Sequence, residues 1–158
     1  MLKPFAKILA EDDTQSIRAA LASALERSDE SPFWAQKVLP LADAVLSVLV
    51  PLRDQGLLFD PEGNPVAELT PELVLRWCDL LSLKTLAFIL QESNQAGALQ
   101  RTKYDASAAE SYRPVELKTL AEYLGSYTVN LEDEWQDFPI AHYNLHVGIA
   151  GVLEKLMR

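Results

Sequence analysis

The most constraining feature of this sequence is a long apolar stretch from Val38 to Leu52. It spans 15 residues and contains one charged side chain, Asp43, together with two prolines. A membrane-crossing helix needs about 20 apolar residues, so this stretch is too short for one. The apolar pattern extends back to Pro32 and covers most sides of a helix, which is typical of the central helix of a bundle. We therefore predict a buried helix from Pro32 to about Arg53.

Helical periodicity also covers most of the remaining chain. A Ser or Thr followed by Pro precedes two of the apolar runs, at Ser31-Pro32 and Thr70-Pro71, and this pair is typical of a helix start. Besides the central helix, helices are predicted at about 14–27, 71–80, 82 to between 94 and 97, 114–125 and 139–156. The sequence thus predicts an all-α helical bundle of about six helices. Its length of 158 residues fits a single all-α domain, 1–158.

Two segments interrupt the helical pattern. Short extended runs flank the turn sequence Asp60-Pro61-Glu62-Gly63-Asn64, so one short β-hairpin is predicted near residues 57–67. Residues 98–113 are polar and weakly patterned, which predicts a loop with at most one helical turn near 106–110.

The charge balance limits the classes of partner. The chain has 14 Lys and Arg against 23 Asp and Glu, which gives a net charge of −9. Strong direct nucleic-acid binding is not expected, because the affinity for phosphates comes from basic residues. The only cysteine, Cys78, forms no intrachain disulfide and is expected to be a core residue in a reducing compartment.

The two histidines, His142 and His146, are the only metal-ligand pair suggested by spacing. Four residues apart, they lie on one face of a predicted helix, as in helices that bind metals. The glutamate of a metalloprotease helix is missing after His142, and a third ligand would have to come from Asp137 or elsewhere. The main interpretation is two hydrogen-bonded histidines in the bundle, with no metal, no cofactor and no catalytic residues. Nearby, Gly148 and Gly151 are interpreted as allowing close helix packing.

The densest acidic cluster contains an aromatic residue. Its members are Glu132, Asp133, Glu134 and Asp137, with Trp135 among them. Acidic residues before a helix favour its positive N-terminal end, which is one interpretation. The other is a docking surface for a basic partner, with Trp135 as an anchor. Both interpretations remain open at this point, and these five residues are the candidate partner-binding site.

The start of the central helix resembles a known family. The sequence Asp-Glu-Ser-Pro-Phe-Trp-Ala at 29–35, followed by the apolar helix to Leu52, is similar to the all-α domain of type IV secretion and conjugation coupling proteins. The segments 68–86 and 138–146 also look like the branch of this family that includes the Dot/Icm-type couplers.

The resemblance implies a binding role. In this family the all-α domain is inserted in a hexameric, membrane-anchored ATPase, where it faces the cytoplasm at the inner membrane of bacteria and helps to select substrates. The expected partners are secreted effector proteins or relaxase–DNA complexes with a basic segment on the protein, and other secretion-system subunits. The phosphate-binding loop of the ATPase is absent here, so we expect an excised domain without enzyme activity of its own.

Two alternatives belong to other classes. One is a free-standing helical adaptor or immunity protein. The other is a small metal-dependent helical enzyme that uses His142, His146 and carboxylates.

Overall fold

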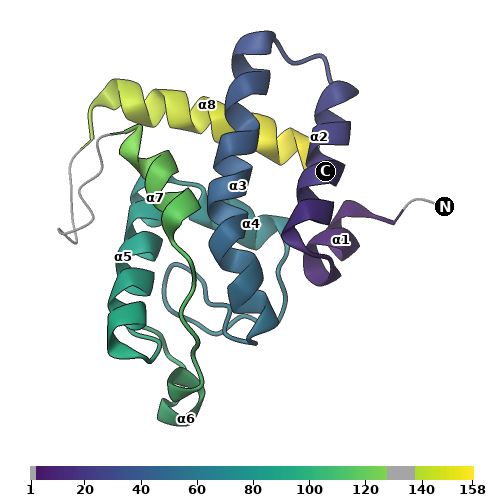
Figure 1. The fold of residues 1–158 in the computed structure, drawn as a ribbon. Coiled ribbons are helices and arrows are strands. Elements are labelled where there is room, and N and C mark those ends of the chain that lie inside the picture. Colours follow the sequence, from purple (N-terminus) through teal and green to yellow (C-terminus); the bar gives the residue numbers. More distant parts are fainter. Residues whose placement is uncertain (1–2, 128–137) are drawn as a thin grey trace.

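The computed structural model describes residues 3–127 and 138–158 (Figure 1). Over these ranges the chain forms eight α-helices and no strand, which confirms the predicted all-α class. The helices are α1 (Phe5–Glu11), α2 (Thr14–Glu26), α3 (Pro32–Asp54), α4 (Pro71–Trp77), α5 (Leu80–Ala96), α6 (Ala106–Glu110), α7 (Lys118–Gly125) and α8 (Ile140–Leu156).

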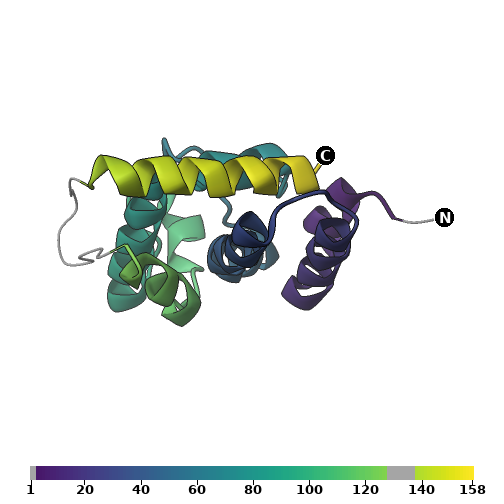
Figure 2. The ribbon, with the colours of Figure 1, turned by 90° about the horizontal axis from the view of Figure 1, so that it is seen from above.

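The predicted central helix is α3. It stands between α2 on one side and α7 with α5 on the other, and α8 lies across this row (Figures 1 and 2). Ser31 takes the N-cap position and Pro32 the first turn, as the sequence predicts. By length and composition alone α3 could cross a membrane, but ten of its residues are buried within the bundle. Packing against the neighbouring helices therefore accounts for its apolar sequence.

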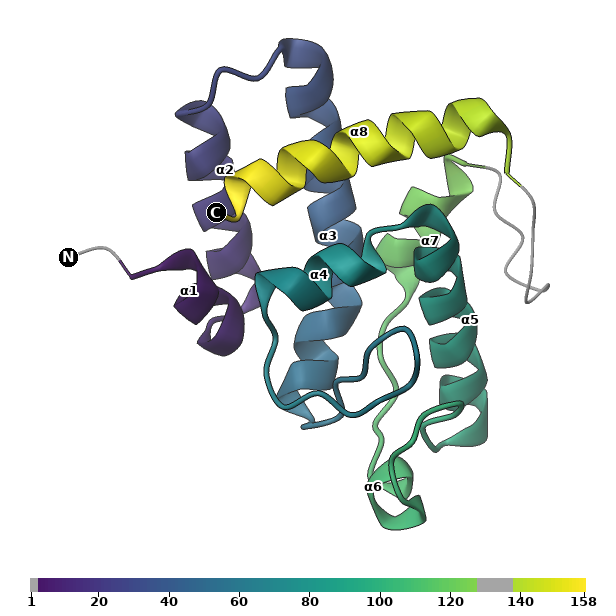
Figure 3. The ribbon, with the colours of Figure 1, turned by 180° about the vertical axis from the view of Figure 1, so that it is seen from behind.

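The second layer consists of α8 and α4, which lie on the same side of α3 (Figure 3). The contact of α8 with α3 is close at Gly148, where a Cβ atom would lie 2.4 Å from the Trp34 ring. A side chain at this position would require the Trp34 ring or the helix to shift. Gly151 has nothing within 4 Å of the same position, so close packing is confirmed for Gly148 and not for Gly151.

The predicted hairpin is reduced to a single isolated bridge between Phe59 and Pro65. The turn between them is held by Asp60, whose side chain accepts hydrogen bonds from the backbone N–H groups of Glu62 and Asn64 at 3.0 and 2.9 Å. Two backbone hydrogen bonds flank the bridge, from Asp60 N–H to the Asn64 carbonyl and from Val66 N–H to the Leu58 carbonyl, both 3.0 Å long.

Helix α4 ends at Trp77 and α5 begins at Leu80, two to three residues before the predicted boundary between them. Two larger differences from the expectation concern α7 and α1. Helix α7 begins at Lys118 and not at Pro114, because the Asn94 side chain bonds both the N–H and the C=O of Val115, at 3.0 and 2.9 Å. Those backbone groups are then not free for a helical turn. Helix α1 was not predicted. Arg53 donates a hydrogen bond to the carbonyl of Leu9 in α1 at 2.7 Å, and the sequence of residues 5–11 does not reveal this tertiary contact.

The segment 98–113 contains the helical turn expected near 106–110, which is α6. Asp105 caps this helix, since its carboxylate accepts a hydrogen bond from Ala108 N at 2.8 Å. None of the residues of α6 is buried. The rest of the segment is loop and turn, as predicted.

Candidate functional site: a cleft between α3, α7 and α8

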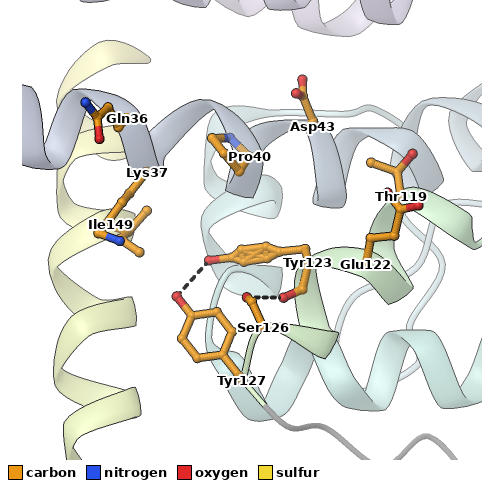
Figure 4. Close-up of a pocket in the computed structure, with 10 residues that line it drawn as sticks. All are labelled: Gln36, Lys37, Pro40, Asp43, Thr119, Glu122, Tyr123, Ser126, Tyr127 and Ile149. Carbon is orange, nitrogen blue, oxygen red and sulfur yellow. Dashed lines mark hydrogen bonds between the residues drawn. The ribbon is translucent and has the colours of Figure 1, made fainter.

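A cleft of about 450 Å³ opens where α3, α7 and α8 meet (Figure 4). Its lining combines four apolar or aromatic residues with six polar or charged ones. The lining residues are Gln36, Lys37, Pro40, Asp43, Thr119, Glu122, Tyr123, Ser126, Tyr127 and Ile149.

Pro40 gives the α3 side of the cleft its shape. Its ring faces Tyr123 across the cleft in Figure 4. Because proline has no backbone N–H, the carbonyl of Gln36, one turn earlier, lacks the usual helical donor. Helix α3 nevertheless continues through Pro40 without a break in its assignment. The cleft therefore lies beside an acceptor group that the helix itself does not use.

The charged residues of the cleft differ in how they are held. The Lys37 ammonium lies over the Phe33 ring, 5.0 Å from its centroid. The carboxylate of Asp43 accepts a hydrogen bond from Arg18 Nε at 2.9 Å. Glu122 is exposed and forms no ion pair within residues 3–127 and 138–158. A cationic group entering the cleft therefore finds one carboxylate, that of Glu122, without a cationic partner in the described part of the chain.

A buried chain of polar groups runs from the cleft into the core. His146 Nε2 contacts the carbonyl oxygen of Cys78, which only accepts hydrogen bonds, so Nε2 carries the proton. In the neutral ring, Nδ1 then accepts from the Tyr123 hydroxyl at 3.1 Å. The hydroxyl of Tyr127 lies 3.4 Å from that of Tyr123, and the two rings stack with centroids 5.4 Å apart.

Burial favours the uncharged forms of His146, Tyr123 and Cys78. It lowers the pKa of His146 and raises the pKa of Tyr123 far above its usual range. It also raises the pKa of the Cys78 thiol to about 12, so the thiolate needed for nucleophilic chemistry is not formed at neutral pH. The core role expected for Cys78 fits these properties. The groups connect α7 and α8 to the end of α4, and they offer neither a base nor a nucleophile to a substrate.

The histidine pair is not arranged as a metal site. Both ring nitrogens of His146 are engaged by Tyr123 and Cys78. The Nδ1 atom of His142 is buried without a hydrogen-bond partner, and its ring packs on that of Tyr127 at 5.6 Å. In the part of the chain that is described, no three His, Cys, Asp or Glu residues gather closely enough to hold a metal ion.

The acidic cluster expected to bind a partner lies outside the described residues. Glu132, Asp133, Glu134, Trp135 and Asp137 all fall between residues 128 and 137. The last described residue before them is Tyr127, which lines the cleft. The cleft and the predicted acidic cluster are therefore close to each other in the sequence.

Sequence reasoning did not identify the residues of the cleft itself. Two signals point to it in retrospect. Tyr123 and Tyr127 are four residues apart, the spacing that places two side chains on one helix face. Pro40 stands inside a helix interior, where proline needs a structural reason.

Comparisons with family models, with curated protein sequences and with solved structures gave no match.

Proposed function

We propose that this chain is the substrate-recognition domain of a type IV coupling protein and that it binds basic segments of effector or relaxase proteins. The observation on which this rests is the position of Tyr127. It lines the cleft between α3, α7 and α8, and the acidic stretch follows it directly in the sequence. Glu132, the first acidic residue of that stretch, follows Tyr127 by five positions in the sequence.

The distribution of charge supports a basic partner. Residues 128–137 contain four acidic side chains and no basic one. In the whole chain, acidic residues outnumber basic ones by nine. Glu122, at the edge of the cleft, adds a further exposed carboxylate. Opposite charges accelerate and orient association, whereas a phosphate backbone is repelled. The proposal therefore places the contact on the protein component of a relaxase–DNA complex.

The chemistry of the described residues supports binding without turnover. Cys78 is buried with a raised pKa, and His146 has both nitrogens in hydrogen bonds. Neither is available for nucleophilic or general-base catalysis at a substrate. The domain would select substrates, and any ATP hydrolysis would belong to other parts of a larger protein.

The test is a binding titration with relaxase or effector proteins encoded beside this chain. Changing Glu132, Asp133 and Glu134 together to Lys should weaken binding by about a hundredfold, because each reversed charge removes an attraction and adds a repulsion. The wild-type affinity should also fall as salt is raised.

A matched control separates this site from net charge. Changing the exposed residues Glu68, Glu110 and Glu116 to Lys alters the net charge equally at other surfaces. Affinity that falls in both triple variants alike would mean that only overall charge matters. Unchanged affinity in the first variant would refute the docking site.

The coding sequence around this chain gives a second test. The proposal expects a continuous frame with membrane helices and a phosphate-binding loop upstream, and an acidic ATPase strand downstream. A start codon at Met1 and a stop directly after Arg158 would contradict it.

A further inference from the structure

Helix α8 has one face that is buried in the bundle and a second, largely apolar face that is only partly covered. The face directed at the bundle contains the buried residues His146, Ile149, Val152, Leu153 and Leu156. The opposite face has residues spaced by three or four, namely Ile140, Tyr143, Val147, Ala150, Gly151 and Glu154. Five of these six are uncharged and four are apolar. Among the described residues of this second face, Tyr143 and Ala150 pack partly against the core, whereas Ile140 and Val147 are exposed.

Two of the most exposed large apolar side chains among the described residues also lie on this face. Three large apolar side chains are mostly exposed in this part of the chain, and two of them are Ile140 at 76% and Val147 at 68%. Both belong to this second face of α8. A gathering of exposed apolar residues on one surface, in contrast to scattered ones, marks an interaction site.

This face forms one wall of a groove. A cavity of about 340 Å³ lies between α8 and the α4–α5 junction, on the side of the molecule seen in Figure 3. Leu75 and Leu80 form the other wall. The groove has open space beside α8 at Gly151, since a Cβ there would meet nothing within 4 Å. We name it the α4/α8 groove.

The charges in the α4/α8 groove have one sign. Its charged lining residues are Asp79 and Glu154, and no Lys or Arg lines it in the described part of the chain. The Asp79 carboxylate accepts hydrogen bonds from Ser82 N and Oγ at 3.2 and 3.4 Å, and it forms no ion pair within residues 3–127 and 138–158. Over the same residues, Glu154 pairs with the exposed Arg158 at 3.4 Å. The groove thus attracts cations at its rim.

We propose that the α4/α8 groove binds an amphipathic helix of a partner protein, with the apolar face of that helix in the groove and Lys or Arg on its flanks. This is the arrangement by which amphipathic helices bind apolar grooves. A second copy of this chain fits less well, because two-fold pairing would bring Asp79 and Glu154 of both copies together. The inference does not depend on any role of the α3/α7/α8 cleft.

The test uses two synthetic amphipathic peptides of about 20 residues with identical Leu positions. One has Lys at the flanking positions and the other has Glu. We expect the Lys peptide to bind the wild-type chain, and the Glu peptide to bind at least about tenfold more weakly. Fluorescence anisotropy of labelled peptides measures both affinities.

Two variants locate the site. Val147→Glu puts a charge on the exposed apolar face, and Gly151→Leu fills the groove with a better helix former. Each should weaken binding of the Lys peptide by about tenfold or more without altering the circular dichroism spectrum. Glu110→Lys, on the exposed helix α6, changes the net charge away from both the groove and the cleft and should leave the affinity within about twofold.

Several outcomes would overturn the proposal. One is equal affinity of the Lys peptide for wild type and Gly151→Leu; another is no binding at millimolar concentration. Sedimentation that shows self-association lost in Val147→Glu would assign the groove to a second copy. Binding to phosphatidylcholine vesicles that depends on Val147 would assign it to a membrane surface.

Discussion

Gly148 is the residue at which α8 comes closest to the Trp34 ring, with 2.4 Å between the ring and the position of a Cβ. Gly148→Ala should therefore destabilise the protein by about 1–3 kcal/mol, because the added methyl forces a displaced ring or helix. Urea unfolding followed by circular dichroism measures the change.

Gly151 provides the matched control one turn later on the same helix. It has open space at the Cβ position, so Gly151→Ala should stabilise the protein by about 0.5–1 kcal/mol through its gain in helix propensity. Equal effects of the two substitutions would contradict the close contact at Gly148.

The second prediction at this scale concerns His146, whose pKa is lowered in the folded protein by burial. Unfolding restores the ordinary pKa near 6.5, so the unfolded state binds a proton that the folded state does not. The contribution of His146 to the free energy of unfolding is therefore fully present above pH 6.5. It is lost as the pH falls toward the lower pKa of the folded state. Denaturation midpoints measured from pH 7.5 to 5.5 should therefore decrease.

His146→Gln should remove this pH dependence, since a glutamine keeps polar contacts but does not titrate. If the variant shows the same decrease between pH 7.5 and 5.5 as the wild type, other groups cause it. Asp13 and Asp60 have lowered pKa values and affect stability only in more acidic solution.

At the scale of elements, Pro40 lies in the interior of a helix, whereas Pro71 lies in the first turn of one. Pro40 is inside α3, where it deprives the Gln36 carbonyl of a donor. Pro40→Ala restores that hydrogen bond but makes the unfolded chain more flexible, so a net gain of about 1–2 kcal/mol is expected. Thermal unfolding with van't Hoff analysis measures this gain.

Pro71 is the matched control because it stands in the first turn of α4, where no N–H bond is lost. Pro71→Ala should be neutral or destabilise by up to about 1 kcal/mol. If both variants were stabilised by similar amounts, the hydrogen bond restored to the Gln36 carbonyl would not explain the gain in Pro40→Ala.

How much of the fold could be predicted depends on how local its causes are. The start of α3 was predicted because Ser31 and Pro32 lie beside each other in the sequence. The start of α7 was predicted wrongly because Asn94, more than 20 residues away, holds Val115 in a non-helical contact. For the same reason α1 was missed, since its bond to Arg53 spans 44 residues.

The candidate site follows the same rule. The spacing of Tyr123 and Tyr127 places them on one face, but nothing in it shows that Pro40 lies across the cleft. Likewise, the pairing of His142 with His146 is visible in the sequence. The hydrogen bonds of His146 to Tyr123 and Cys78 come from other elements and could not be predicted.

At the scale of the whole described molecule, stability should be greatest where most helices meet. Helix α3 contacts α2, α4, α7 and α8, and its residues from Ala44 to Leu49 are buried except for Ser47. Amide hydrogen exchange measured by NMR should be slowest there, because exchange needs global unfolding.

Helix α6 gives the internal comparison, since none of its residues is buried. Its amides should exchange through local opening, with much lower protection than those of α3. If α3 exchanged as fast as α6, the central position of α3 would not govern the stability of the bundle.

The close contact of Trp34 with Gly148 also restricts which sequences can share this fold. A larger residue at position 148 fits only if the residue at position 34 is smaller, because the two occupy the same space. Homologous chains should therefore vary at these two positions together, with the summed volume nearly constant. Position 151, which has no such neighbour, should vary independently of position 34.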